Sequence, residues 1–230
     1  SPRHHEWITL SVDQAAPATG TEQTADPAEG ERSLRVFVAF PERPDPAPAV
    51  IVIHENRGLT DWVRSFADQL AGAGYLAIAP DLLSDFDGNY RQTSDFPDQD
   101  AARTALYALD PGQITLDLMA VQQFAAGHEA ADGSVSVAGF CWGGAQTFRF
   151  ATDTEGLAGA FVFYGSSPSD SAAYGAIRTP VFGFYAENDQ RINSQLPATR
   201  EFAEQAGVRF EPAMYPGSGH AFMRLGEEPD

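Results

Sequence analysis

Cys141 is the only cysteine in the chain, and it lies between glycines in Gly139-Phe-Cys-Trp-Gly143. The segment follows the apolar run 135–138 and matches the strand-to-helix nucleophile elbow G-x-S-x-G, with cysteine in place of serine. A turn this sharp needs small residues on both sides, because a Cβ there would collide with the returning helix. The backbone N–H of Trp142 could then donate to a developing oxyanion. The pattern indicates a nucleophilic thiol, and a buried structural cysteine is the alternative.

An elbow nucleophile needs an acid and then a histidine later in the chain, in that order. Asp189 follows the apolar stretch 179–186, which is typical of a buried strand, and α/β folds place functional side chains at the carboxyl ends of strands. His220 directly follows the tight turn 216–219. Taken alone, Asp189 could be a helix cap and His220 a solvated side chain. Of five histidines, only His54 and His220 are placed where a site could use them.

The region around His54 makes the pattern specific, because the apolar stretch 49–53 leads directly into His54-Glu-Asn-Arg-Gly58. Further signatures follow in the order Gly74-Tyr-Leu-Ala-Ile-Ala-Pro-Asp-Leu82, the elbow at Cys141, Glu-Asn-Asp189 and Gly-His220-Ala-Phe. Over about residues 32–224, this set resembles the dienelactone hydrolase family of α/β-hydrolases. The resemblance implies a carboxymethylenebutenolidase-like enzyme that hydrolyses small esters or lactones.

The resemblance also implies a role for each matching residue. Cys141 would be the nucleophile, His220 the base and Asp189 the residue that orients the histidine. Glu55 matches a family glutamate that meets the resting cysteine. The backbone N–H groups of Asn56 and Trp142 match the two donors of the oxyanion hole.

Arginines that hold a substrate carboxylate in the family have counterparts here as well. Arg224 stands four residues after His220, at the position of one of them. The second matches either Arg103 or Arg91, and Arg103 is preferred because 98–109 is more typical of the helix that carries it. The family usually adds a closing helix after the histidine loop, whereas this chain ends ten residues beyond His220. That departure makes the placement of Arg224 an open question.

The chemistry fits these roles without the family name. A thiol is only a few per cent thiolate at neutral pH, so it needs an imidazole or another base to activate it. Attack on an ester or lactone carbonyl gives a thioester, which a water activated by His220 hydrolyses, while Asp189 fixes the imidazole tautomer. Amides are a poorer target, because a thiolate leaves the tetrahedral intermediate more readily than an unprotonated amine. A broad-specificity carboxylesterase and a non-catalytic protein with the same fold remain the alternatives.

Length and composition predict one catalytic domain over 1–230. The chain has 230 residues, 43% of them hydrophobic, with no internal repeat and no apolar run long enough for a membrane span. Residues 1–12 do not form a signal-peptide core, and one cysteine permits no internal disulfide. These features favour a cytoplasmic protein. A zincin motif would need a second histidine at Gly58, and a P-loop would need a lysine, so we expect neither a metal nor a cofactor.

The charge balance is strongly acidic, with 32 acidic residues, 14 basic residues and a net charge of −18. Every basic residue other than histidine is arginine, since the chain contains no lysine. Such a surface repels phosphates, so we expect a small-molecule substrate and no nucleic acid partner. It favours a halophilic cytoplasm, where salt screens self-repulsion. A GC-rich genome could explain the missing lysines but not the acidic excess.

The elements that must position these residues alternate between strand and helix, which predicts an α/β-hydrolase fold: a doubly wound, mostly parallel sheet with helices on both faces. Two antiparallel strands come first, joined by a flexible acidic loop at 15–31. The helix at 61–73 should bury Trp62, Phe66 and Leu70, and the four phenylalanines at 161, 163, 182 and 184 should lie in the core. Strands are expected at 5–12, 32–40, 49–54, 75–79, 134–139, 159–164, 179–186 and 209–215, and helices at 61–73, 98–109, 113–126 and 144–152.

Overall fold

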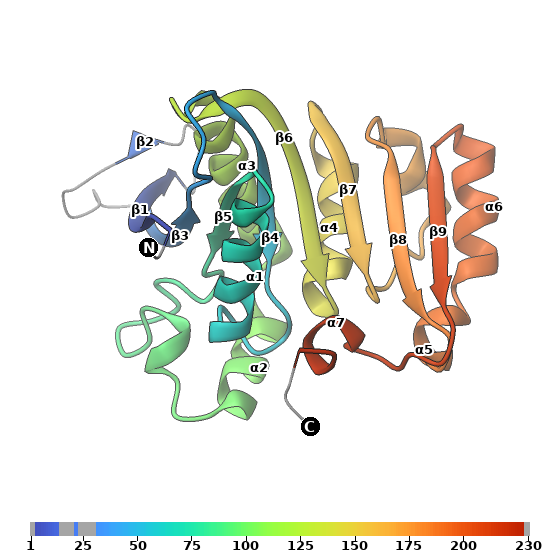
Figure 1. The fold of residues 1–230 in the computed structure, drawn as a ribbon. Coiled ribbons are helices and arrows are strands. Elements are labelled where there is room, and N and C mark those ends of the chain that lie inside the picture. The colour runs from blue at the N-terminus through green and yellow to red at the C-terminus, as the bar shows by residue number, and fades with distance from the viewer. Residues whose placement is uncertain (1–2, 14–20, 23–30, 228–230) are drawn as a thin grey trace. The chain divides into compact units, whose positions relative to one another are not determined.

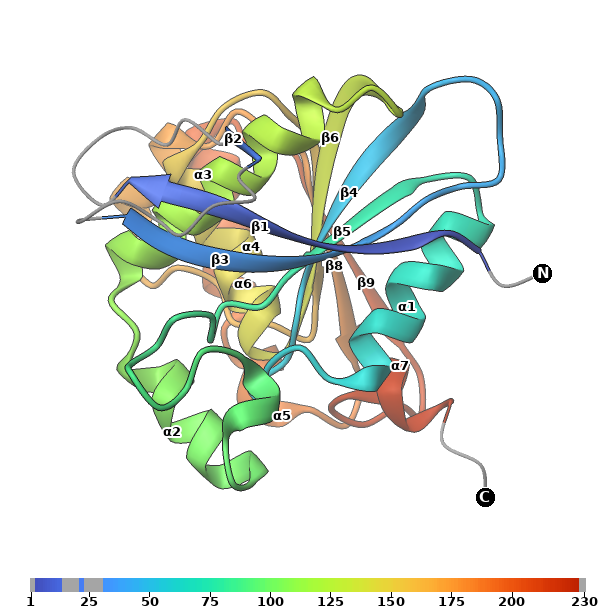
Figure 2. The ribbon, with the colours of Figure 1, turned by 90° about the vertical axis from the view of Figure 1, so that its left-hand side faces the viewer.

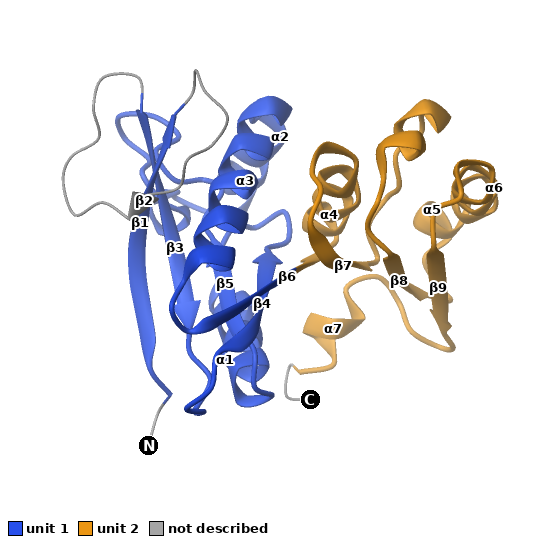
Figure 3. Ribbon diagram, turned by 90° about the horizontal axis from the view of Figure 1, so that it is seen from above, with its two compact units in different colours: residues 1–135 blue, residues 136–230 orange. Residues whose placement is uncertain are grey.

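A computed structural model describes residues 3–13, 21–22 and 31–227. The chain divides into two compact units, residues 1–135 and 136–230, coloured separately in Figure 3. Most of the predicted loop at 15–31 lies outside the described residues. None of the helices in the described ranges is long and apolar enough to cross a membrane.

The strands of the first unit lie in the order β2-β1-β3-β5-β4 (Figure 1). The long antiparallel pair β1–β3, seen face-on in Figure 2, runs in register from His5 opposite Ala39 to Asp13 opposite Glu31. Strands β4 and β5 are parallel. The predicted antiparallel start and parallel continuation are therefore confirmed. The strand bounds are β1 His5–Asp13, β2 Thr21–Glu22, β3 Glu31–Ala39, β4 Ala47–Ile53 and β5 Leu76–Pro80.

Helices cover both faces of this part of the sheet, with α1 on one side and α3 on the other (Figure 3). Helix α1 buries Val63, Ala67 and Ala71 rather than the predicted stripe of larger residues. Small side chains let the helix backbone approach the strands, while Trp62 and Phe66 lie half-buried at the flank with ring centroids 6.0 Å apart. The helices are α1 Asp61–Gly72, the 3₁₀ turn η1 Thr93–Asp95, α2 Gln99–Ala108 and α3 Pro111–Gly127.

Strand β6, Ala131–Phe140, begins in the first unit and ends in the second, where the order is β6-β7-β8-β9. Strands β7, β8 and β9 are parallel, and α4, η2 and α6 lie on one face of them. The sequence prediction omitted α6, although Pro197 in its first turn and a left-handed Gly207 at its end mark its bounds. The remaining bounds are α4 Trp142–Asp153, β7 Leu157–Phe163, η2 Ser171–Ala176, β8 Val181–Ala186, α5 Gln190–Asn193, α6 Leu196–Ala206, β9 Phe210–Tyr215 and α7 Phe222–Leu225.

The four phenylalanines of β7 and β8 are only half-buried, in contrast to the prediction that they lie in the core. Alternate residues of these strands, including Val162 and Tyr185, are fully covered, whereas the phenylalanines share the opposite face. Their rings stack across the strands, with centroids 4.5 Å apart for Phe163 and Phe184. The two faces of this sheet are therefore packed differently, and the aromatic face consists of stacked rings.

Candidate active site

Cys141 occupies the turn between β6 and α4, as the elbow motif predicts. Its φ of +53° lies in a region that residues with side chains rarely adopt. The backbone holds the turn, because the Cys141 N–H donates to Phe163 O at 3.0 Å at the end of β7. A Cβ on Gly139 would collide with the backbone of Gly143, which explains the glycine two residues before Cys141. The strained turn presents the thiol at the carboxyl end of the strand.

The imidazole of His220 joins Cys141 to Asp189. Its Nδ1 lies 2.5 Å from Asp189 Oδ2, and its Nε2 lies 3.1 Å from Cys141 Sγ. Because a carboxylate oxygen accepts hydrogen bonds, Nδ1 carries the proton and donates a hydrogen bond to Asp189 Oδ2. The lone pair of Nε2 then faces the thiol and can accept its proton. The second unit thus brings together the nucleophile, base and acid predicted from the sequence.

Asp189 is a helix cap, as one of the two interpretations of the sequence allowed, and its carboxylate also contacts His220. It is the N-cap of α5, and its Oδ1 accepts the N–H of Ile192 at 3.4 Å, while Oδ2 faces His220. The side chain is only 6% exposed, whereas that of His220 is 32% exposed. Capping holds the carboxylate in place. The imidazole is therefore held at Nδ1 by Asp189, while part of its ring stays accessible to solvent.

Direct hydrogen bonds join the loop that carries Asp189 to the loop that carries His220. Glu187 Oε2 accepts the N–H of Gly217 at 2.8 Å, and the Asn188 N–H donates to Ser218 O at 3.0 Å. Gly217 has a φ of +73°, which suits the tight turn predicted before the histidine. Since each loop supports the other, the spacing of Asp189 and His220 does not depend on one side chain alone.

Trp142 is the first residue of α4 and directly follows the nucleophile. The N-terminus of a helix carries a partial positive charge, which favours an anion that forms next to it. This position agrees with the predicted role of the Trp142 N–H in an oxyanion hole. The predicted second donor, Asn56, and Glu55 lie in the loop after β4, in the first unit.

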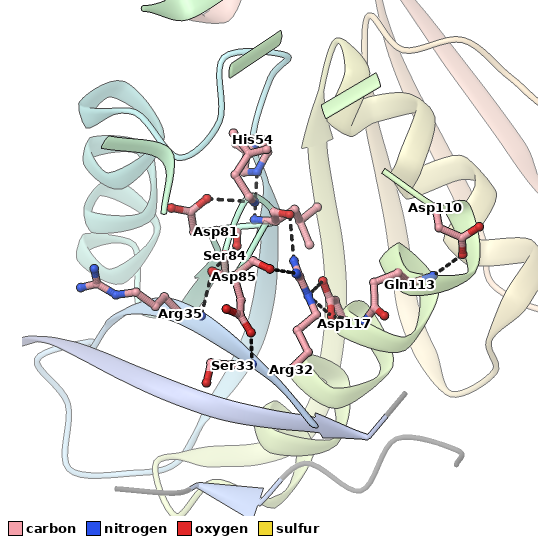
Figure 4. A network of polar contacts seen from close by, with 12 residues as sticks. Arg32, Ser33, Arg35, His54, Asp81, Ser84, Asp85, Asp110, Gln113 and Asp117 are labelled. Carbon is pink, nitrogen blue, oxygen red and sulfur yellow. Dashed lines mark hydrogen bonds and ion pairs between the residues drawn. The ribbon is translucent and has the colours of Figure 1, made fainter. Parts of the chain in front are cut away.

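The loop that carries Glu55 and Asn56 is held by the buried side chain of His54. Leu82 N–H donates to His54 Nε2 at 3.2 Å, so Nδ1 carries the proton and donates to Glu55 O at 2.8 Å. Burial lowers the pKa of His54, which agrees with a neutral ring. Figure 4 shows this contact within a larger network. His54, one of the two candidate histidines, therefore supports a loop and is fully buried.

The same network continues through two buried charges (Figure 4). Arg32 Nε donates to both oxygens of Asp117 at 3.1 Å, and Arg32 Nη2 donates to Leu82 O at 3.1 Å. Gln113 donates to Asp117 at 2.8 Å. Burial raises the pKa of Asp117, although the neighbouring guanidinium opposes the shift. The pair ties β3 and α3 to the segment after β5.

The three candidate arginines occupy different settings. Arg224 lies half-buried in α7, one turn beyond His220. Arg103 lies on α2 with its side chain 53% exposed and pairs with Asp100 at 3.1 Å, whereas Arg91 lies in the exposed loop before η1. The predicted helix around Arg103 is confirmed. None of the described His, Cys, Asp and Glu residues are grouped in a way that could hold a metal ion.

The sequence reasoning missed Tyr164, whose ring packs against the imidazole of His220 with centroids 5.1 Å apart. A sequence signal was present, because the aromatic–glycine pair Tyr164-Gly165 directly follows β7, and Gly165 lies against Gly144 directly after the elbow. Neither a motif nor a periodic pattern connects that pair to a histidine more than fifty residues later.

The chain is similar in sequence to known hydrolases. The model of the "Dienelactone hydrolase family" matches residues 34–229. A protein of Escherichia coli strain K12 named "Putative carboxymethylenebutenolidase" is 31% identical over 213 residues, which cover 86% of this chain and 76% of that protein. A Bradyrhizobium protein named "Probable 2-oxo-3-(5-oxofuran-2-ylidene)propanoate lactonase" is 28% identical, with 84% of this chain and 80% of that protein covered.

Solved structures agree with the fold. A dienelactone hydrolase structure from Klebsiella pneumoniae, described as putative, has a TM-score of 0.77 at 24% identity and covers 97% of this chain and 90% of its own. The dienelactone hydrolase of Anabaena variabilis has a TM-score of 0.70 at 16% identity, with 100% and 91% covered. The chain has the α/β-hydrolase fold that the sequence predicts.

Proposed function

The chain belongs to the dienelactone hydrolase family and is a hydrolase of esters or lactones; we propose that it works by cysteine nucleophilic catalysis through Cys141, His220 and Asp189. The observation that carries the proposal is the continuous contact from Asp189 Oδ2 to His220 Nδ1 and from His220 Nε2 to Cys141 Sγ, at 2.5 and 3.1 Å. Such a line of acceptor, imidazole and thiol is what an activated cysteine requires.

In the proposed mechanism, Nε2 of His220 takes the thiol proton as Sγ attacks the substrate carbonyl carbon. The tetrahedral intermediate collapses when the C–O bond breaks, and Nε2 returns the proton to the departing alkoxide oxygen. In a lactone, that oxygen stays tethered to the acyl group. A water molecule then loses a proton to Nε2 and attacks the thioester, the C–S bond breaks, and the thiol is regenerated. Asp189 stabilises the imidazolium in both halves.

Three further roles belong to this proposal. The N–H groups of Trp142 and Asn56 would donate to the oxyanion, and Glu55 would tune the reactivity of the resting thiol. We also propose that residues 1–230 work as one catalytic domain. Glu55→Gln should change the rate at which iodoacetamide alkylates Cys141 as well as turnover. Equal alkylation rates in both proteins at every pH would mean that Glu55 does not affect the reactivity of the Cys141 thiol.

For the substrate, we propose a small ester or lactone that bears a carboxylate, held by Arg224 and by Arg103 or Arg91. The name of the Bradyrhizobium relative supports this choice, because it describes a lactone ring joined to an acid. The alternative is a broad-specificity carboxylesterase with no preference for charge. A non-catalytic protein is disfavoured by the intact contacts at Cys141.

The surface charge bears on the setting of this reaction. We propose that the protein does not bind nucleic acid and that it works in a halophilic cytoplasm, which the acidic excess behind the net charge of −18 supports. The same charge repels an anionic substrate at long range, so the arginines would have to supply local positive charge. Salt reduces the range of the repulsion from about 10 Å at 0.1 M to about 3 Å at 1 M.

The test is a panel of lactones and aryl esters, each as the free acid and as its methyl ester, at low and high salt. For the acid, kcat/KM should rise with salt more than for the methyl ester, and Arg224→Ala should erase the preference for the acid. Arg178→Ala, which removes an arginine with no proposed site role, is the matched control for net charge. Equal hydrolysis of acid and ester at every salt concentration, unchanged in Arg224→Ala, would favour the carboxylesterase. If the protein hydrolysed no member of the panel, the proposed enzymatic function would be contradicted.

A further inference from the structure

Tyr164 has an unusual backbone conformation at the carboxyl end of β7. Its φ is +40°, in the left-handed region that bulky residues avoid. Among the described residues, four other than glycine have a positive φ: Asp85, Cys141, Tyr164 and Ala221. Cys141 is the proposed nucleophile, and Ala221 directly follows the proposed base. Strained backbone conformations cluster at functional sites, and this connects the conformation of Tyr164 with the proposed active site.

The backbone around Tyr164 is fixed by neighbours from the other triad segments. The Tyr164 N–H donates to Phe184 O at 2.8 Å, on the strand that leads to Asp189. The preceding residue, Phe163, accepts the N–H of Cys141 at 3.0 Å. A Cβ on Gly165 would collide with the backbone of Gly144, which lies in the first turn of α4. The end of β7 is thus bound to the nucleophile turn on one side and to the acid strand on the other.

The side chain of Tyr164 points to the third member of the triad. Its ring is fully buried and meets the imidazole of His220 edge-on, with centroids 5.1 Å apart and planes at 64°. On the same ring, Phe222 packs at 5.2 Å and 69°. Phe222 is the first residue of α7, two positions beyond the histidine, so a single tyrosine ring contacts the segment on both sides of Ala221.

We propose that Tyr164 is a positioning residue, which holds the His220 imidazole so that Nε2 stays directed at Cys141 Sγ. The hydrogen bond from Nδ1 to Asp189 fixes one atom of the ring but permits rotation about that bond. Since 32% of the His220 side chain is exposed, the imidazole needs a packing partner to prevent this rotation. The Tyr164 ring is that packing partner, and the strained φ of Tyr164 directs its ring toward the imidazole.

The inference rests on the proposed function, because it assumes that His220 activates Cys141. It predicts that Tyr164→Leu lowers both kcat and the rate of iodoacetamide alkylation of Cys141 at neutral pH by about tenfold, the scale of one lost aromatic contact. KM should stay within about twofold, because Tyr164 is proposed to act on the base and not on the substrate. Tyr164→Phe, which keeps the ring, should restore both rates to within about threefold of wild type.

The matched control is Tyr174→Leu, which removes another fully buried tyrosine of the second unit, packed against Phe148 and Phe202. It should lower the melting temperature without changing kcat or the neutral-pH alkylation rate of the folded protein. If Tyr164→Leu fails to fold, Tyr164→Met fills the space with a flexible side chain and takes its place.

Two results would overturn the proposal: alkylation and kcat in the Tyr164 variants that match wild type, or losses in Tyr174→Leu that equal those in Tyr164→Leu. Alkylation requires no turnover, so this test is separate from that of the proposed function. If the Cys141→Ala variant stayed active, the proposed function would be wrong. The alkylation rates of the Tyr164 variants would still measure whether Tyr164 aligns the imidazole with the thiol.

Discussion

The proposed catalytic region of the second unit and the buried polar network of the first unit use polar groups in opposite ways. In the network, Arg32 and Asp117 are 6% and 1% exposed, and each makes several hydrogen bonds. In the proposed catalytic region, the thiol and imidazole are partly exposed, and Cys141 lies on strained backbone.

The difference separates the residues that support the fold from those that we propose to react. A buried charge surrounded by donors and acceptors gains little by reacting and loses much when its partner is removed. A thiol that meets one imidazole, on a backbone held in place by β7, can exchange a proton and bind an acyl group. Substitutions in the first region should therefore cost stability, and substitutions in the second should cost turnover.

The largest effect is expected for Cys141→Ala, which should reduce turnover by at least about a thousandfold. Its melting temperature should stay close to that of wild type, because the thiol that is removed is only partly buried. Cys141→Ser should keep some hydrolysis, since serine occupies the same position in related elbows. Steady-state kinetics and thermal unfolding on the same samples provide the check. Undiminished turnover in the alanine variant would disprove the mechanism.

Asp117→Asn is the counterpart in the first unit, and we expect it to lower the free energy of unfolding by about 3–5 kcal/mol, because it leaves the Arg32 guanidinium buried without its anion. The turnover of the folded fraction should change little. The double variant Arg32→Met/Asp117→Leu removes both charges and should recover most of the stability. Denaturant titration measures all three proteins. An Asp117→Asn variant with wild-type stability and reduced turnover would contradict the expectation that substitutions in the network cost stability rather than turnover.

The strain at the nucleophile can be measured with a smaller substitution. Cys141→Gly should raise the free energy of unfolding by about 1 kcal/mol over Cys141→Ala, because glycine adopts a φ of +53° without a steric penalty. Both variants lack the thiol and should be inactive, so they differ only in the Cβ. Equal stability of the two would mean that the turn stores no strain.

The smallest effect concerns a partly exposed ion pair in the first unit. Arg3 lowers the pKa of Asp68 from 3.8 to about 2, with a further contribution from His5. Because the folded pKa is depressed, the pair stabilises the protein above about pH 4 and loses that contribution as the pH falls toward 2. Partial exposure limits the effect to about 0.5–1 kcal/mol. Asp68→Asn should flatten the unfolding free energy over this pH range, and an unchanged slope would assign the acid sensitivity to other carboxyls.

The sequence singled out Cys141, Asp189 and His220 because each is tied to a local pattern: an elbow, a strand end and a tight turn. The structure places these three side chains in contact. The sequence also predicted the antiparallel start and the alternation of strands and helices. It could not predict the pairing of Arg32 with Asp117, which are 85 residues apart, or the contact of Tyr164 with His220, because those depend on how the elements pack. The buried face of α1 was misjudged for the same reason, since small residues pack where large ones were expected.

The most direct test of the central claim is to trap the acyl-enzyme. Wild type mixed with a slowly hydrolysed aryl ester and quenched in acid should gain the mass of one acyl group, on the peptide that contains Cys141. Hydroxylamine should remove that group, as it does from thioesters, and Cys141→Ala should gain no mass. Rapid hydrolysis with no acyl group on Cys141, or a group attached to another residue, would contradict the account.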